Sequence, residues 1–190
     1  MNLGAGRPAG TGTGHVRCLS LLLVAALAAG CGSAKVPSGN APVLLHDGVL
    51  PGWRAVPDAP GIAALAPDLS GLRVTAHADS PALVRAGDAV RATALVFATV
   101  ADAAEVLTRS RAPDFGPVLE KTFRGNIVGR TAGRQRIGYR LTVPRPAEPG
   151  RDTVELYVLR RGRTLALVEF VSAAGFDPVL RSRILEEVSR

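Results

Sequence analysis

The sequence predicts an α+β domain in which a mostly antiparallel sheet of about five or six strands carries at least two packed helices. Three observations support this prediction. Residues 134–143 alternate apolar and polar side chains, as a strand does when one face is buried and the other is solvated. Residues 153–159 and 164–171 flank a short turn and predict a β-hairpin. The segment after Asp177 carries apolar residues at helical spacing.

The first regular elements are expected after residue 71, because proline and glycine are dense before it and favour turns and short strands. Ser70 is interpreted as a turn residue. Segments Leu72–His77 and Val90–Phe97 predict strands. Thr99 precedes Asp102 by three positions, which is the spacing of a helix N-cap. The helix that follows would bury one face, made of Ala103, Val106 and Leu107.

Pro113 and Gly116-Pro117 are expected to interrupt this helix, and a short helical turn resumes over Val118–Phe123. In the predicted hairpin, Gly162 stands where a positive φ is needed. Asp177-Pro178 supplies an N-cap and a first-turn proline for the last helix. Its apolar stripe would be Leu180, Ile184 and Val188, with Val179 and Leu185 beside it.

The first 31 residues predict export. Arg7 and Arg17 are the charged residues among 1–30, and 12 uncharged, mostly apolar residues follow Arg17, too few to span a bilayer. Small residues then lead to Cys31, as at the cleavage site of a signal peptide. The run Leu27–Cys31 resembles the lipobox of bacterial lipoproteins. That resemblance implies cleavage before Cys31, a diacylglyceryl thioether on its sulfur and acylation of the new amino group. An ordinary signal peptide with an incidental cysteine is the alternative.

These features divide the chain into a lipoprotein signal peptide (1–30), a lipidated cysteine with a flexible tether (31–41) and a single globular domain (42–190). Ten tether residues reach roughly 17 Å on average if flexible. Acylated Cys31 would be the partner of the lipid bilayer and would hold the protein at the extracytoplasmic face of the cell membrane. No cysteine follows Cys31, so the domain would fold without a disulfide.

The predicted order is strand, helix, strand, long hairpin, the small-residue link Ser172-Ala173-Ala174-Gly175 and an amphipathic helix. This order resembles the PsbP-like α/β/α sandwich of actinobacterial lipoproteins, and the use of 21 Arg against two Lys suits a high-GC source. The chain is also similar to the extracellular sensor domains of bacterial kinases, which typically carry disulfides, whereas this chain has no cysteine after Cys31. Neither resemblance implies catalytic residues.

No catalytic motif is present, so the sequence predicts no enzyme; a cell-envelope hydrolase is the weakest alternative. The chain contains no Gly-x-Ser-x-Gly, Ser-x-x-Lys or Walker sequence. The histidines after Cys31 are His46 and His77, and each stands near an acid, Asp47 or Asp79. A zinc site needs three or four ligands, so we interpret both histidines as turn or surface residues and predict neither metal nor cofactor.

A basic stretch is the strongest functional signal, since residues 121–145 contain seven positive residues and no acid. Non-catalytic binding of an anionic lipid, a wall polymer or an acidic protein is the leading hypothesis. Solubilisation of an exposed sheet face is its structural alternative, and a sensor or carrier domain for a small apolar or amphiphilic ligand is the second functional hypothesis. Nucleic acid is not expected, because interleaved aromatic residues are missing. The candidate contact residues are Arg134, Arg136, Arg140, Arg160, Arg161 and Arg163.

Overall fold

The computed structural model describes residues 41–46, 48–145 and 149–189. The predicted signal peptide, Cys31 and the predicted tether up to residue 40 lie outside the described residues. The strands are β1 (Arg54–Val56), β2 (Val74–Asp79), β3 (Ala82–Arg85), β4 (Asp88–Phe97), β5 (Asn126–Gly133), β6 (Arg136–Pro144), β7 (Arg151–Arg161) and β8 (Thr164–Ser172). The helices are α1 (Val100–Arg109), α2 (Phe115–Phe123) and α3 (Pro178–Val188), with a short 3-10 turn, η3 (Ala63–Leu65).

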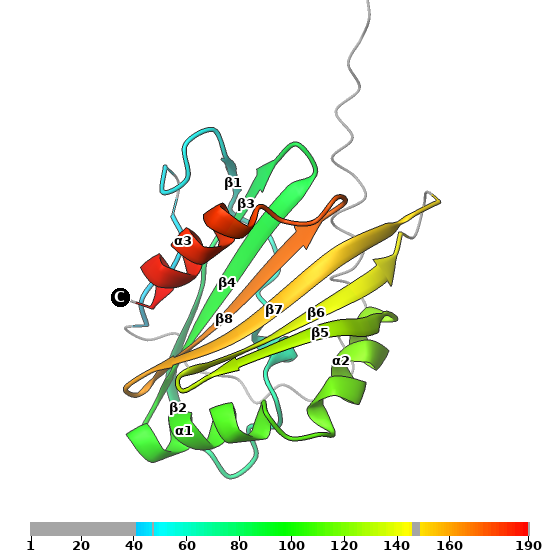
Figure 1. Ribbon diagram of the computed structural model, residues 1–190. Helices are drawn as coiled ribbons and strands as arrows, with labels where there is room; N and C mark the ends of the chain where they lie inside the picture. Colours follow the sequence, from blue (N-terminus) through cyan, green and yellow to red (C-terminus); the bar gives the residue numbers. More distant parts are fainter. Residues whose placement is uncertain (1–40, 47, 146–148, 190) are drawn as a thin grey trace, which may run out of the picture.

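The strands form one antiparallel sheet with the order β1-β3-β4-β8-β7-β6-β5, and β2 pairs with β4 (Figure 1). This confirms the α+β prediction with its mostly antiparallel sheet. The described part of the chain has eight strands, more than the five or six predicted. None of its helices has the length and apolar character needed to cross a bilayer.

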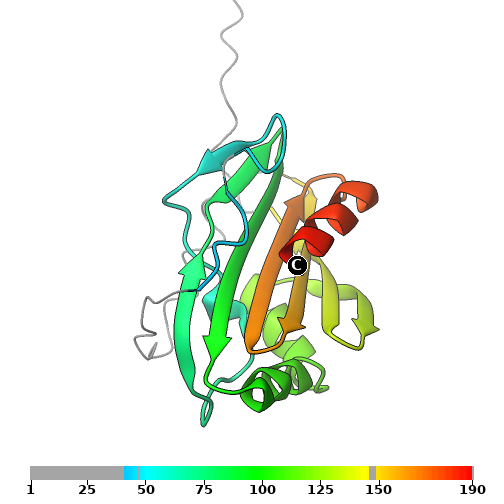
Figure 2. The same cartoon turned by 90° about the vertical axis from the view of Figure 1, so that its left-hand side faces the viewer.

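Each face of the sheet carries its own hydrophobic core. One core lies under α1, α2 and η3 and includes Leu95, Val106 and Leu119. The other lies under α3 and the segment before β1, and includes Phe170 and Ile184. Figure 1 shows α3 in front of the sheet near β4 and β8, and α1 and α2 at the lower end of the sheet. In the view of Figure 2, turned by 90°, α3 again lies beside β8. Helices therefore cover both faces, and side chains on both sides of the central strands β4 and β8 are buried.

The helix ends follow the predicted capping. Thr99 Oγ1 accepts a hydrogen bond from the Asp102 N–H at 3.0 Å. Asp177 Oδ1 accepts from the N–H groups of Val179 and Leu180 at 2.8 and 3.1 Å. The prediction was wrong for the Val179 side chain, which is 77% exposed. The buried side of α3 consists of Ile184, Leu185 and Val188.

The alternation predicted for β6 is confirmed, since its buried apolar side chains are Ile137, Tyr139, Leu141 and Val143. The hairpin of β7 and β8 is also confirmed, and Gly162 in its turn has a φ of 56°.

Four elements differ from the sequence expectation. β1 and β3 are three and four residues long, too short to show a pattern. β5 is an edge strand that contains Gly129 and Gly133 and has mostly exposed side chains, so it lacks apolar alternation. α2 begins at Phe115, not at Val118. Pro117 is accommodated because N–H groups of a first helical turn have no partner within the helix.

The edge at β5 is partly closed by α2. Glu120 Oε1 accepts a hydrogen bond from the Ile127 N–H at 2.8 Å. A side chain of the helix thus occupies one of the backbone donors near the start of this edge strand.

Candidate functional site: an arginine-lined groove

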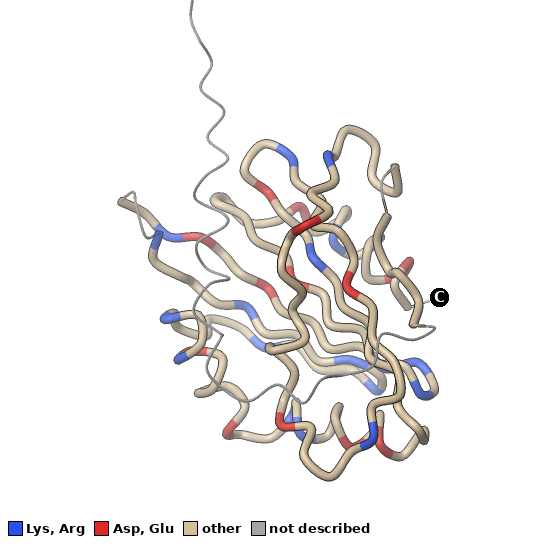
Figure 3. Tube along the Cα trace, turned by 180° about the vertical axis from the view of Figure 1, so that it is seen from behind, with Lys and Arg blue, Asp and Glu red and all other residues tan. Residues whose placement is uncertain are grey.

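A groove of about 1200 Å³ opens where the β5–β6 and β7–β8 turns meet the end of α3. Its lining comes from three further segments besides α3: the chain around residues 42–46, residues 133–136, and the β7–β8 hairpin with its turn. The two turns are joined directly, because the Arg160 N–H donates to the Gln135 carbonyl at 2.8 Å. In Figure 3, basic positions gather at these turns.

Four of the six candidate arginines border this groove, namely Arg134, Arg136, Arg160 and Arg161. Arg136 and Arg161 are exposed and leave their strands on the α3 face, as Leu159 does. Arg134 is exposed in the β5–β6 turn. Arg160 leaves β7 on the opposite face, and its Nε is buried without a hydrogen-bond partner among the described residues.

The structure separates the other two candidates from the groove. Arg140 shares the α3 face with Arg136, but its Nε donates to Glu155 Oε1 at 2.9 Å. Arg163 lies in the β7–β8 turn, and its Nη1 donates to the Ala98 carbonyl at 3.4 Å. The arginine surface is therefore centred on the two turns and does not run as a continuous ladder along β6.

Glu155 joins α3 to the sheet, and the end of α3 lines the groove. Glu155 is 2% exposed, and its carboxylate accepts from Arg181 Nη1 on α3, at 2.7 and 2.8 Å to its two oxygens. It also accepts from Arg140 and from the Tyr157 hydroxyl, the latter at 3.0 Å. Burial raises the pKa of Tyr157, and the neighbouring Glu155 charge raises it further. These contacts hold Arg140 against Glu155, and the Arg140 side chain is half exposed.

The floor of the groove is apolar. Arg136 on β6 is in register with Leu159 on β7, and Leu159 is in register with Ala166 on β8. Leu159 and Ala166 are each 5% exposed. Val43, on the N-terminal segment, is 56% exposed at the rim. One row across the sheet thus places a guanidinium group beside two apolar side chains.

The position of the β5–β6 turn is fixed from the α1–α2 link. Arg111 Nη2 donates to the carbonyl of Arg134, at 3.0 Å, and to that of Gly133. The Arg111 carbonyl in turn accepts from Arg130 Nη2 at 2.6 Å. Arg111 and Arg130 are therefore positioning residues for the turn that carries Arg134.

The histidines do not form a joint site. His46 borders the groove, and Asp47 lies outside the described residues. His77 Nε2 lies 3.9 Å from Asp79 Oδ2, and Asp79 also accepts a hydrogen bond from the buried Thr93 hydroxyl. In residues 41–46, 48–145 and 149–189, no group of three or more His, Cys, Asp or Glu gathers in a way that could hold a metal ion.

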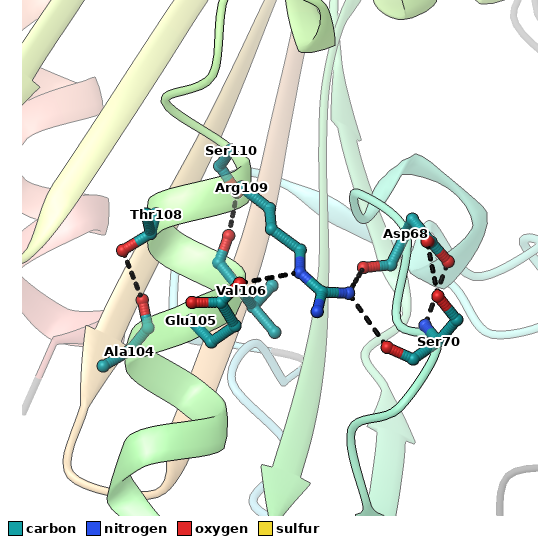
Figure 4. Close-up of polar contacts among 8 residues, drawn as sticks. All are labelled: Asp68, Ser70, Ala104, Glu105, Val106, Thr108, Arg109 and Ser110. Atoms are coloured by element: carbon teal, nitrogen blue, oxygen red, sulfur yellow. Dashed lines mark hydrogen bonds and ion pairs between the residues drawn. The ribbon is translucent and has the colours of Figure 1, made fainter.

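A second polar cluster joins α1 to the loop before β2 (Figure 4). Arg109 Nη1 donates to the carbonyls of Asp68 and Ser70 at 2.9 and 3.0 Å, and its Nε donates to Glu105 at 3.0 Å. The Ser70 hydroxyl donates to Asp68 at 2.6 Å, which confirms Ser70 as a turn residue. Hydrogen bonds from the Ser70 side chain and backbone lower the pKa of Asp68. The cluster fixes a loop.

The sequence analysis missed the groove residues that come from the two ends of the domain. The apolar run Val43-Leu44-Leu45, directly after the tether, was a usable signal, because such a run usually packs against a core. The end of α3, with Val188 and Ser189, reaches the groove only through tertiary packing.

Comparison with known proteins gives little further information. No protein-family model matches the chain, and no curated protein matches it. Among solved structures, the chain is similar to the extracellular domain of PknH from Mycobacterium tuberculosis, with a TM-score of 0.40 and 8% sequence identity. The similarity covers 57% of this chain and 61% of that chain. The fold and the groove together define this protein as an α+β domain with an arginine-lined groove.

Proposed function

We propose that the protein is an actinobacterial lipoprotein with a PsbP-like α/β/α sandwich, anchored through acylated Cys31 at the extracytoplasmic face of the cell membrane. Its role is non-catalytic: the arginines at the groove dock the domain on anionic lipid headgroups. The lipobox-like run Leu27–Cys31 supports the anchor. The gathering of Arg134, Arg136 and Arg161 at one end of the sheet supports the docking surface.

The observation that carries this proposal is the place where the chain enters the domain. Pro42 borders the groove and stands eleven positions after Cys31. A flexible segment of that length reaches roughly 18 Å on average. A bilayer that holds Cys31 would therefore lie within short reach of the arginine end. The opposite end of the sheet, at the β3–β4 turn, would point away from it.

The charges are sufficient for weak docking. A basic residue near an anionic membrane contributes about 1 kcal/mol, and the contribution fades within a Debye length of about 8 Å at physiological salt. The three exposed groove arginines would together add about 3 kcal/mol to the anchoring supplied by the acyl chains. Wall polymers and acidic proteins share the anionic chemistry and are outcomes that the following experiment separates.

Vesicle sedimentation tests the docking surface. The full chain carries Cys31→Ser, so that no acyl group contributes, and is mixed with vesicles of phosphatidylcholine alone or with anionic phosphatidylglycerol. Reversal of two groove charges, Arg134→Glu with Arg161→Glu, should weaken binding to the anionic vesicles by roughly 30-fold or more. The matched control is Lys121→Glu with Arg124→Glu, which changes the net charge equally at the end of α2.

Equal loss in both double variants would mean that net charge alone drives adsorption, and the docking surface would be refuted. Binding that is unaffected by either variant would direct the search to wall polymer or protein partners. The anchor has its own test. In the native host, Cys31→Ser should move the protein from the membrane fraction to the soluble fraction, and full retention in the membrane would contradict lipidation.

A further inference from the structure

We propose that the groove binds one anionic amphiphile, a molecule with a phosphate headgroup and a single alkyl chain. The inference rests on the proposed function, because both use the groove arginines. It adds that the apolar floor receives the alkyl chain of an individual molecule. The groove would then bind single lipid molecules, in addition to docking the protein on a lipid surface.

The headgroup site consists of Arg134, Arg136 and Arg161. Their side chains form no hydrogen bond or ion pair with any part of the chain that the structure describes. Arg136 on β6 is in register with Leu159 on β7, and Arg161 follows Leu159 by two residues on the same face. The two arginines are therefore diagonal neighbours, with Cα atoms about 7–8 Å apart. The forked guanidinium groups at the ends of these two long side chains can both reach a phosphate placed between them and bind it by bidentate contacts. Among the described residues that line the groove, four are arginines and one, Glu187, is acidic.

The chain site lies next to these arginines. Leu159 and Ala166 form the floor, and Val43, Leu44 and Val188 of α3 also line the groove. Val43 is a large hydrophobic residue that the fold leaves exposed, and an alkyl chain would cover it. The volume of about 1200 Å³ exceeds the roughly 300–1,000 Å³ of typical ligand pockets. A headgroup alone would fill only a small part of it.

A chain-length series tests this directly. Inorganic phosphate, hexyl, octyl and decyl phosphate are titrated calorimetrically into the full chain carrying Cys31→Ser, below the micelle-forming concentration of each probe. Each methylene that enters the apolar groove should raise the affinity about fourfold. The affinity should stop rising once the chain outgrows the groove. Binding should saturate at one probe per protein, and decyl maltoside, which has the same chain and an uncharged head, should bind more weakly.

Two variants separate the parts of the site. Thr164→Trp adds bulk on the α3 face in register with Arg161 and leaves the charge unchanged, so it should lower decyl phosphate affinity about tenfold or more. Thr122→Trp on exposed α2 is its matched control and should bind as the parent does. Arg136→Glu should abolish the preference for decyl phosphate over decyl maltoside, and Lys121→Glu should keep it.

The outcomes distinguish this inference from the proposed function. If affinity is independent of chain length, or if Thr164→Trp and Thr122→Trp bind decyl phosphate equally well, the amphiphile site is refuted, although adsorption to anionic vesicles can persist. If vesicle adsorption also fails to depend on Arg134 and Arg161, both proposals are refuted. If the affinity for the alkyl phosphates rises about fourfold per methylene, and Thr164→Trp removes this dependence on chain length, the amphiphile site is established.

Discussion

The ion-pair network around Glu155 gives a prediction that tests how α3, and with it one wall of the groove, is held on the sheet. Glu155→Gln removes the carboxylate charge that two arginines share. Removal of one partner from a buried pair typically costs about 3–5 kcal/mol, because the remaining charge stays buried. Here the Arg140 side chain is 50% exposed and regains water, whereas that of Arg181 is 17% exposed. We therefore expect the lower limit, about 3 kcal/mol of unfolding free energy.

Urea unfolding of the full chain carrying Cys31→Ser provides the assay, with the fluorescence of Trp53 as the signal. Trp53 is the sole tryptophan and its ring centre lies 5.7 Å from that of Phe176, just before α3, so it reports on this core. With a slope of about 2 kcal/mol per molar urea, the midpoint should fall by about 1.5 M.

The two arginines provide an internal comparison. Arg181→Gln breaks two short hydrogen bonds from a mostly buried side chain, and Arg140→Gln breaks one from a half-exposed side chain. Arg181→Gln should therefore be the more destabilising by about 1–2 kcal/mol. Equal effects of the two variants, or a change below about 0.5 kcal/mol for Glu155→Gln, would refute the reasoning.

Three further predictions concern other parts of the domain. A Cβ at Gly138 would overlap the ring of Tyr157, so Gly138→Ala should lower the unfolding free energy by about 1–3 kcal/mol in the same urea assay, and an unchanged midpoint would contradict the packing. Burial raises the pKa of both Tyr139 and Tyr157 above 10.0, so the unfolded chain loses its phenolic protons at a lower pH than the folded chain. The free energy of unfolding should therefore fall as the pH rises above 10.0. Tyr157→Phe should lessen that fall, as measured by urea unfolding across alkaline pH. Arg109→Met removes the hydrogen bonds to the loop at Ser70 and should cost about 1 kcal/mol with faster amide exchange in that loop, whereas unchanged exchange would show that the loop is held by its own packing.

Much of the sheet could be predicted from the sequence because its central strands bury one or both faces completely. β6 shows this best, since its alternation assigns each side chain to a face without knowledge of the neighbouring strands. β5 could not be predicted in this way, because an edge strand with two glycines and exposed side chains carries no burial pattern. Glu155 shows the converse case: alternation alone does not distinguish a solvated carboxylate from one enclosed by arginines of β6 and α3.

The groove lay beyond sequence reasoning for a different reason. Arg134 and Arg161 could be singled out as exposed positive residues, but their approach depends on the antiparallel register of β6 and β7. Residues around 43 and 188 reach the same groove across almost the whole length of the domain. Such meetings are set by tertiary packing, and local patterns do not encode them.

The meeting of the two ends of the domain at the groove makes the attachment point separable from the fold. Residues 42–44 and 187–189 line the same groove, so a short glycine-rich linker could join them and new termini could be opened at the exposed β3–β4 turn near Gly87. Such a circular permutant would keep the same contacts but carry the proposed lipid anchor at the opposite end of the sheet. The arginines would then face away from the bilayer. The orientation of the domain relative to the membrane could thus be reversed without substituting any of its residues.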